Sequence, residues 1–253
     1  MWHARSLPGL VLGLVMMGSV PGVVAAGPPF ELAVKKDHLF GSSKGTLVFD
    51  AEGVEYWTAD KDDARRWSYP DVKQIQILAP RRIAVLTYED QGRLKLGADR
   101  TFRFEVVEGT VLPELVAFLL DRISQPVVTA VMPPMSSTPP LYRVLVKYER
   151  GGRGSDGTLL LHEDRLVYLT EAEGHARYWR LADIFAVLQL DRYRLEVLAY
   201  EGGGGETRRF TFQIKTELPE GFYEALWVRV NPPTLDLRKA AAGGLAEAPQ
   251  PRP

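Results

Sequence analysis

The chain has 253 residues, with no cysteine and only four histidines. The absence of cysteine excludes disulfide bonds, thiolate metal sites, a cysteine nucleophile and a lipid anchor attached through cysteine. A metal site needs three or four converging ligands, so here it would have to rest on carboxylates. We therefore expect no metal, no cofactor and no catalytic residue.

An excess of charge of one sign is missing as well. The 31 Lys and Arg residues balance the 32 Asp and Glu residues and leave a net charge of −1. Such a chain creates no long-range field that attracts nucleic acid or an anionic membrane. It also has no P-loop, no Gly-x-Ser-x-Gly elbow and no His-Glu-x-x-His helix. A hydrolase built from carboxylates such as Glu89 and Glu201 remains a minor alternative.

The N-terminus has the pattern of a secretory signal. A cationic start with Arg5 precedes an apolar stretch at 7–24, and Val24-Ala25-Ala26 provides small residues for signal peptidase. The alternative, a retained membrane anchor, needs about 20 strongly apolar residues, and Gly and Pro dilute this stretch. We expect cleavage near Ala26 and a periplasmic or secreted protein, and the lack of cysteine suits a bacterial one.

The chain contains its own sequence twice. A constant offset of 112 residues carries Gly45-Thr46-Leu47 to Gly157-Thr158-Leu159 and Trp67 to Trp179. Residues 45–89 match residues 157–201 with 15 identities and no gap. This repeat is longer than the roughly 20 to 50 residues of a solenoid unit. It therefore predicts two copies of one whole domain.

Both copies alternate apolar and polar residues with the period of two that is typical of half-buried strands. The pattern predicts strands at 30–36, 46–49, 54–58, 64–69, 73–78, 82–88 and 101–107, and again at 142–148, 158–161, 165–170, 176–181, 185–190, 194–200 and 209–213. Helical spacing closes each copy, at about 111–123 and 217–230. The predicted fold class is mainly β (α+β), with about seven antiparallel strands and one C-terminal helix per copy.

Composition sets the remaining boundaries. Residues 126–140 contain five prolines with Ser and Thr, which is typical of an extended, semi-rigid spacer. The Ala, Gly and Pro of the C-terminal end predict disorder. The predicted organisation is a signal peptide at 1–26, a first domain at 27–125, a Pro-rich linker at 126–140, a second domain at 141–232 and a disordered tail at 233–253.

Each copy has a Trp-containing strand that leads into an Asp, as Trp67 and Asp71 and as Trp179 and Asp183. With the strand number and the closing helix, this pattern resembles the pleckstrin-homology-like superfold, especially its bacterial and GRAM-type members. The resemblance implies two tandem PH-like domains, each a partly open barrel capped by a C-terminal helix. A small closed β-barrel with an accessory helix is the alternative. The pattern from His38 to Leu47 also resembles exported bacterial proteins, which implies no activity.

The first inter-strand loop of each copy holds the candidate ligand-binding residues, because PH-like domains use this loop for phosphate ligands. The candidates are Lys35, Lys36, His38 and Lys44 in the first copy and Arg150 and Arg153 in the second. The second loop is also rich in glycine, whose backbone N–H groups can face an anion. The phosphoinositide pattern of the superfold ends on a basic residue, whereas Gly45 and Thr46 follow Lys44 here.

Residues retained in both copies point to structural roles. Trp67 and Trp179 are expected in the two cores, since a large ring most often closes a core. Asp71 and Asp183 are expected to accept backbone N–H bonds in a turn. Arg65 and Arg177 are candidate partners of Glu89 and Glu201.

The sequence therefore predicts a non-catalytic exported binding or scaffold protein with an unknown protein partner in the cell envelope. It would present sheet edges, loops and the groove beside the closing helix. The alternative is an envelope module that binds an anionic lipid or glycan through the loops at 35–44 and 150–156. The fold by itself implies neither function.

Overall fold

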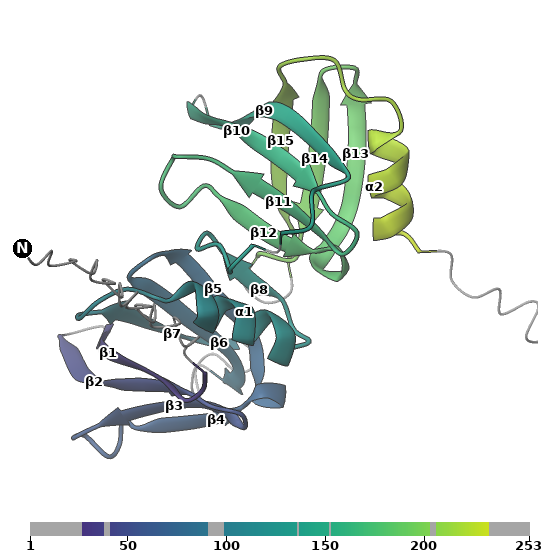
Figure 1. Cartoon of the computed structure of the whole chain (residues 1–253). Helices are drawn as coiled ribbons and strands as arrows, with labels where there is room; N and C mark the ends of the chain where they lie inside the picture. The colour runs from purple at the N-terminus through teal and green to yellow at the C-terminus, as the bar shows by residue number, and fades with distance from the viewer. Residues whose placement is uncertain are drawn as a thin grey trace, which may run out of the picture.

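The structure is a computed structural model, and it describes residues 27–37, 41–90, 99–135, 137–151, 153–202 and 206–232. These residues form a mainly β structure with two α-helices, which confirms the predicted class (Figure 1). Neither helix is long and apolar enough to cross a membrane. The predicted signal peptide, His38 and the predicted tail lie outside the described residues.

Seven strands and a helix make up the first half of the described chain. They are β1 (Phe30–Asp37), β2 (Ser42–Phe49), β3 (Gly53–Thr58), β4 (Arg65–Ser68), β5 (Val72–Ala79), β6 (Arg82–Asp90), β7 (Asp99–Val106) and α1 (Pro113–Arg122), with a 3-10 turn, η1 (Tyr69–Asp71), between β4 and β5. Each strand expected in the first copy is present.

The second half repeats this order. It contains β9 (Tyr142–Arg150), β10 (Arg153–Leu161), β11 (Arg165–Leu169), β12 (Arg177–Arg180), η2 (Leu181–Asp183), β13 (Ile184–Asp191), β14 (Arg194–Ala199), β15 (Arg208–Ile214) and α2 (Phe222–Val230). Both halves pair their strands in the same spatial order, β5-β6-β7-β1-β2-β3-β4 and β13-β14-β15-β9-β10-β11-β12. Within the described residues this is one open sheet that ends at β13 and β4, so the closed-barrel alternative does not hold.

Two strands begin four or five residues earlier than their sequence predicts. β2 starts at Ser42 and β10 at Arg153, in stretches of Ser, Gly and charged residues with weak β propensity. These stretches pair because β1 and β9 continue opposite them, with Asp37 facing Ser42 and Arg150 facing Arg153. Hydrogen bonding across the hairpin thus overrides the local preference.

The repeated Gly-Thr-Leu motif has a steric cause. A Cβ on Gly45 would stand 2.1 Å from the Trp57 carbonyl oxygen and 2.7 Å from the Tyr56 ring. A Cβ on Gly157 would meet Leu169 and Tyr168 in the same way, at 2.2 and 2.5 Å. Only glycine allows β2 and β10 to pack against the tyrosine of the next strand.

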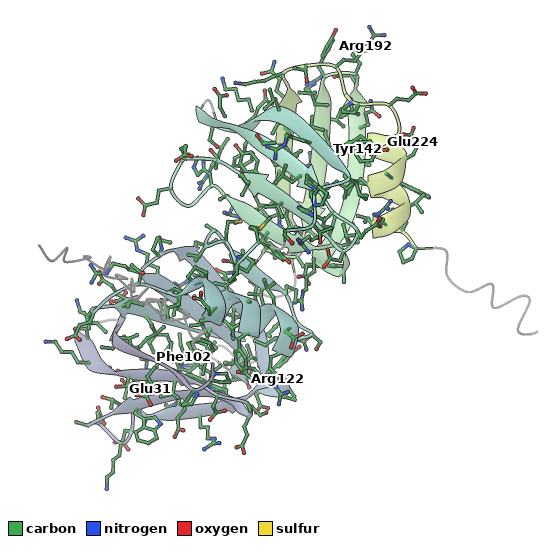
Figure 2. The ribbon with its side chains drawn as sticks, in the orientation of Figure 1. Glu31, Phe102, Arg122, Tyr142, Arg192 and Glu224 are labelled. Atoms are coloured by element: carbon green, nitrogen blue, oxygen red, sulfur yellow. The ribbon has the colours of Figure 1, made fainter. Side chains whose placement is uncertain are left out.

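Each half encloses its own hydrophobic core. Trp67 and Trp179 are both only 2% exposed, which confirms their predicted core positions. Phe102 lies inside the first half in Figure 2, and its ring centroid is 4.6 Å from that of Trp67. The closing helices add their buried faces, Leu115, Val116 and Leu119 from α1 and Phe222 and Leu226 from α2.

The predicted linker enters the sheet. Val127–Thr129 form β8, which pairs in parallel with β5 and meets β12 through Thr129 opposite Tyr178. All three β8 residues are buried. The proline content of 126–140 predicts a spacer, but three β-favouring residues between the prolines find open strand edges on both sides. β8 thereby joins the two halves into the single sheet of Figure 1.

Arg180 of the second half holds the end of α1 at this junction. Its guanidinium donates to the carbonyls of Leu120 at 3.1 Å, Ile123 at 2.5 Å and Gln125 at 2.8 Å, where the last carbonyls of a helix need partners. It also forms an ion pair with Asp183 at 2.8 Å. The sequence predicts a backbone N–H partner for Asp183, whereas the described contacts of its carboxylate are with the Arg180 guanidinium.

Replacement of Arg180 by Ala is expected to lower the free energy of unfolding by about 3 kcal/mol, because the buried Asp183 carboxylate loses its cation. Burial already raises the pKa of Asp183, against the opposing effect of Arg180. Urea unfolding measures the loss. The double variant Arg180→Ala, Asp183→Asn should recover part of it, and an Arg180→Ala protein as stable as the parent would contradict this role.

Candidate functional site

The structure brings two of the predicted ligand-binding residues together. Lys35 and Lys44 lie opposite each other on β1 and β2, and so on one face of the hairpin, with Glu105 of β7 opposite Lys35 on its other side. Lys44 is exposed and Lys35 half-buried. Arg150 is exposed at the end of β9 opposite the backbone of Arg153, whose side chain lies outside what the structure describes. The basic face of the first hairpin is therefore small.

Lys36 points the other way, into the first half. Its side chain is 5% exposed and pairs with the Asp63 carboxylate. The same carboxylate accepts a hydrogen bond of 2.5 Å from the Ser43 hydroxyl, and Ser43 lies 2.8 Å from the Tyr56 hydroxyl. Lys36 is thus a buried structural cation, and its burial removes it from the solvent-facing basic group that the sequence predicts.

The second half keeps the positions of this cluster and changes its chemistry. The offset of 112 places Tyr148 at Lys36, Ser155 at Ser43, Tyr168 at Tyr56 and His175 at Asp63. His175 Nδ1 lies 2.9 Å from Ser155 Oγ, which lies 3.0 Å from the Tyr168 hydroxyl. The Tyr148 ring stands edge-on to His175 at 5.8 Å. The ion pair of Lys36 with Asp63 in the first half is therefore replaced by a ring contact of Tyr148 with His175 in the second half.

A second cluster is kept in both halves. The Trp179 indole N–H donates to Glu201 at 2.7 Å, and Trp67 donates to Glu89 at 2.5 Å. Arg177 also donates to both carboxylate oxygens of Glu201, at 3.0 and 3.1 Å, which confirms the candidate pair in the second half. Arg65 donates instead to the carbonyls of Asp62 and Ala64. Each Glu thus satisfies the polar edge of a buried Trp.

These contacts give the two carboxylates that both copies retain a structural role. Glu201 is buried and engaged by two donors, and Glu89 lies 3.9 Å from Arg100 in addition to its Trp67 bond. Within the described part of the chain, no group of three or more His, Asp and Glu side chains is arranged to hold a metal ion. The two carboxylates of the hydrolase alternative thus lie in different halves, each bonded to the Trp of its own half.

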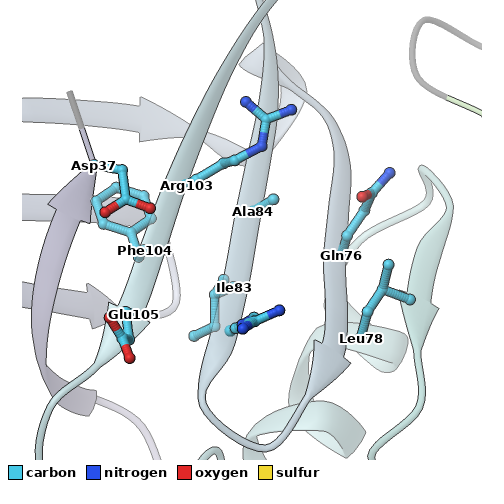
Figure 3. Close-up of a pocket in the computed structure, with 9 residues that line it drawn as sticks. Asp37, Gln76, Leu78, Ile83, Ala84, Arg103, Phe104 and Glu105 are labelled. Carbon is cyan, nitrogen blue, oxygen red and sulfur yellow. The ribbon is translucent and has the colours of Figure 1, made fainter. Parts of the chain in front are cut away.

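A groove of about 410 Å³ lies over β5, β6 and β7 and reaches Asp37 at the end of β1 (Figure 3). Ala84 stands between Gln76 and Arg103 of the neighbouring strands, and its short side chain leaves the hollow between them. The rim carries both signs of charge, from Asp37 and Glu105 and from Arg82 and Arg103. This mixture gives the groove no preference for an anion or a cation.

An exposed apolar surface lies on β13 and the turn that follows it. We call it the β13 apolar strip: Phe185, Leu188, Leu190 and Tyr193, each between 43% and 54% exposed. Leu188 and Leu190 are two residues apart and follow the buried Val187, so both project from the outer face of the sheet. Monomeric proteins seldom gather large apolar side chains in one exposed place without a use for them.

Comparison of the two copies reveals this strip. The offset of 112 gives Lys73, Gln76, Leu78 and Arg81 at the same four positions of the first copy. Three of the four positions thus change from polar to apolar. The strip contains no charged or nucleophilic residue, so it is not among the sites predicted from the sequence, and the change between the copies is the signal that marks it.

A scan against protein-family models and a search of curated proteins return no match to this chain. Among solved structures, the C-terminal domain of an unknown protein from Leishmania infantum is similar over 36% of this chain and 84% of its own, with 11% identity and a TM-score of 0.29. The Spt16D Pob3N heterodimer structure is similar over 70% of this chain and 87% of its own, with 8% identity and a TM-score of 0.28. Likenesses this small carry no argument about function.

The two histidines of the second half make stability depend on pH. Burial lowers the pKa of His175 below its ordinary 6.5, and Arg150, Arg177 and Arg208 lower it further. Burial is also the main cause that lowers the pKa of His162. The unfolded chain therefore binds more protons than the folded one once the pH falls below the unfolded value, so the free energy of unfolding should decrease as the pH falls through about 6.5.

Urea unfolding at a series of pH values tests this expectation. His175→Gln should flatten the dependence, and adding His162→Gln should flatten it further, because each change removes one depressed pKa. A pH dependence that both variants leave unchanged would show that other groups cause it.

Proposed function

We propose that the protein is a non-catalytic, exported bacterial binding protein whose second half docks another polypeptide of the cell envelope through the β13 apolar strip. The exposed strip is the observation that carries the proposal. Full burial of a Leu or Phe side chain contributes about 1.5–3 kcal/mol, and a few such anchors dominate most protein interfaces. The ion pair of Asp191 with Arg194, beside Tyr193, supplies a polar rim.

The finer description of the fold belongs to the same proposal. Two hydrophobic cores, one strand order repeated, and one closing helix per half support two tandem PH-like domains at 27–125 and 141–232. The pattern of residues 1–26 supports export with cleavage near Ala26. The polypeptide partner is then a periplasmic or secreted protein.

Contacts within the first half support the choice of the second half. Lys73 pairs with Asp99, and Arg81 donates at 2.9 Å to the Val106 carbonyl, so both side chains are held by their own domain. Their counterparts Phe185 and Tyr193 are half-exposed rings. Only the second copy presents apolar side chains at these positions to a partner.

A second candidate function rests on the basic hairpin. Lys35 and Lys44 share one face of β1 and β2, and Arg150 is exposed at the matching end of β9. Such residues suit an anionic lipid headgroup or a charged glycan. Glu105 beside Lys35 and the burial of Lys36 reduce the positive charge, so this remains the alternative.

Capture experiments with residues 27–253 on envelope extracts test the proposal. A single stoichiometric protein, identified by mass spectrometry and retained at high salt, is expected, since apolar contacts are not screened. Leu188→Asp should reduce its capture about tenfold or more, the loss of one anchor. Leu145→Asp, a similarly exposed leucine on β9, is the matched control and should bind normally.

Two outcomes would count against the strip. Equal capture by Leu188→Asp and the parent, with both proteins folded, would remove it from the interface. Retention of lipid or glycan at low salt only, with loss on Lys35→Glu and Lys44→Glu, would favour the alternative.

A further inference from the structure

The groove over β5, β6 and β7 is lined by four exposed charged side chains, those of Asp37, Arg82, Arg103 and Glu105. Arg82 of β6 lies directly opposite Glu105 of β7, where opposite charges ordinarily attract. Among the residues that the structure describes, however, these four side chains form no ion pair and no hydrogen bond. The groove therefore holds two cations and two carboxylates whose charges are not used within the fold.

The charges are distributed around the groove. Figure 3 shows Asp37 and Glu105 on one side, Gln76 and Leu78 on the other side and Arg103 between the two sides. Arg103 and Glu105 are two residues apart on β7, so their Cα atoms are separated by about 7 Å. Two residues of an extended peptide span a similar length of about 7 Å. The spacing thus suits a ligand whose own opposite charges lie one or two amino-acid residues apart.

The size of the groove suits a small molecule. Its volume of about 410 Å³ lies within the range of roughly 300–1,000 Å³ that is typical of ligand pockets. The short side chain of Ala84 leaves the hollow, and Leu78 provides an apolar wall. A ligand with one modest apolar side chain can therefore lie between the charged groups.

The second half fills the corresponding hollow with a side chain of its own. Glu196 of β14 faces Thr211 of β15, as Ala84 of β6 faces Arg103 of β7. Glu196 is buried, accepts a hydrogen bond of 3.2 Å from the Thr211 hydroxyl and lies 3.6 Å from the Arg209 guanidinium. A bonded carboxylate thus occupies the place that Ala84 leaves open.

The second half also lacks the unused charges. Arg194 stands in the place of Arg82 and pairs with Asp191 at 2.8 Å. Gln213 faces Arg194 as Glu105 faces Arg82, so one of the carboxylates is replaced by a neutral amide. The fold therefore does not require the charges of the first copy, and a ligand that carries both signs gives them a use.

We propose that this groove binds a small zwitterion that carries an ammonium and a carboxylate, either a free amino acid or a short peptide with both ends free. Arg82 and Arg103 bind the carboxylate, since a guanidinium matches its two oxygens. Asp37 and Glu105 bind the ammonium, and Leu78 contacts an apolar side chain of the ligand. The inference goes beyond the proposed function and does not rest on it, because the groove lies in the first half and the β13 apolar strip in the second.

Titration of residues 27–253 with the dipeptide L-alanyl-L-leucine, followed by the NMR shifts of the β6 and β7 amides, tests the proposal. We expect a Kd of about 1 mM or lower at low salt, and weaker binding at high salt, because exposed charges are screened. N-acetyl-alanyl-leucine lacks the ammonium and alanyl-leucine amide lacks the carboxylate, so each should bind about tenfold more weakly or worse. A parallel titration with L-leucine shows whether the free amino acid or the peptide binds more tightly.

Two double variants assign the ends of the ligand to the two sets of charges. Arg82→Gln, Arg103→Gln should bind alanyl-leucine and its amide equally, because neither guanidinium is left to recognise the carboxylate. Asp37→Asn, Glu105→Gln should bind alanyl-leucine and its N-acetyl form equally. The control Arg143→Gln removes an exposed arginine of β9, outside the groove, and should bind all three peptides as the parent does.

A substitution in the hollow provides a further test. Ala84→Glu introduces the residue of the second copy, which fills the hollow beside Arg103, and should weaken binding of alanyl-leucine about tenfold or more. Ala84→Ser keeps a short side chain and should bind like the parent.

Two results would overturn the proposal. One is equal binding of the free and blocked dipeptides by the folded parent, and the other is no shift of the β6 and β7 amides with either L-leucine or alanyl-leucine at about 10 mM. Leu188→Asp, which tests the β13 apolar strip, should bind alanyl-leucine normally. The groove and the strip are thus tested separately, and either proposal can fail without the other.

Discussion

The edge strands of a sheet leave a row of backbone N–H and C=O groups that need hydrogen-bond partners. In this protein the three residues of β8, Val127–Thr129, provide such partners between the two halves. β8 pairs with β5 on one side and with β12 on the other. Two further sets of contacts also join the two halves, the bonds of Arg180 to the end of α1 and that of the Gln74 amide to the Tyr200 carbonyl at 2.8 Å. A short segment of ordinary β-favouring residues thus decides that two duplicated units form one sheet.

The duplication separates contacts that the fold requires from contacts that it tolerates. The bond from the Trp indole to Glu and the glycine packed against Tyr occur in both halves with the same geometry. The cluster of Lys36 and Asp63 becomes Tyr148 and His175, so its position is retained while its chemistry changes. Retained pairs here mark the scaffold, because each buried polar edge needs its own partner.

The sequence predicts most of the regular structure and little of the surface. Alternation of apolar and polar residues locates the strands, and helical spacing locates the two helices. Both patterns are local in the sequence, and the internal repeat shows each of them twice. β8 escapes prediction because its stability comes from two distant edges, which a proline-rich composition conceals. Lys36 is assigned to a ligand loop because its partner Asp63 is 27 residues away, and only the folded hairpin brings them together.

Divergence between the copies is the better guide to function. Lys73 and Arg81 of the first copy are held by Asp99 and by the Val106 carbonyl, whereas Phe185 and Tyr193 replace them in the second copy as half-exposed rings. Among the described contacts, the centroid of the Phe185 ring lies 5.8 Å from that of Tyr200. This contact covers only part of one of the exposed apolar side chains. An exposed apolar group adds little to folding and favours aggregation. The change from polar to apolar at two positions of β13 and at one in the turn after it is therefore the feature of the second copy that supports the proposed contact with another polypeptide.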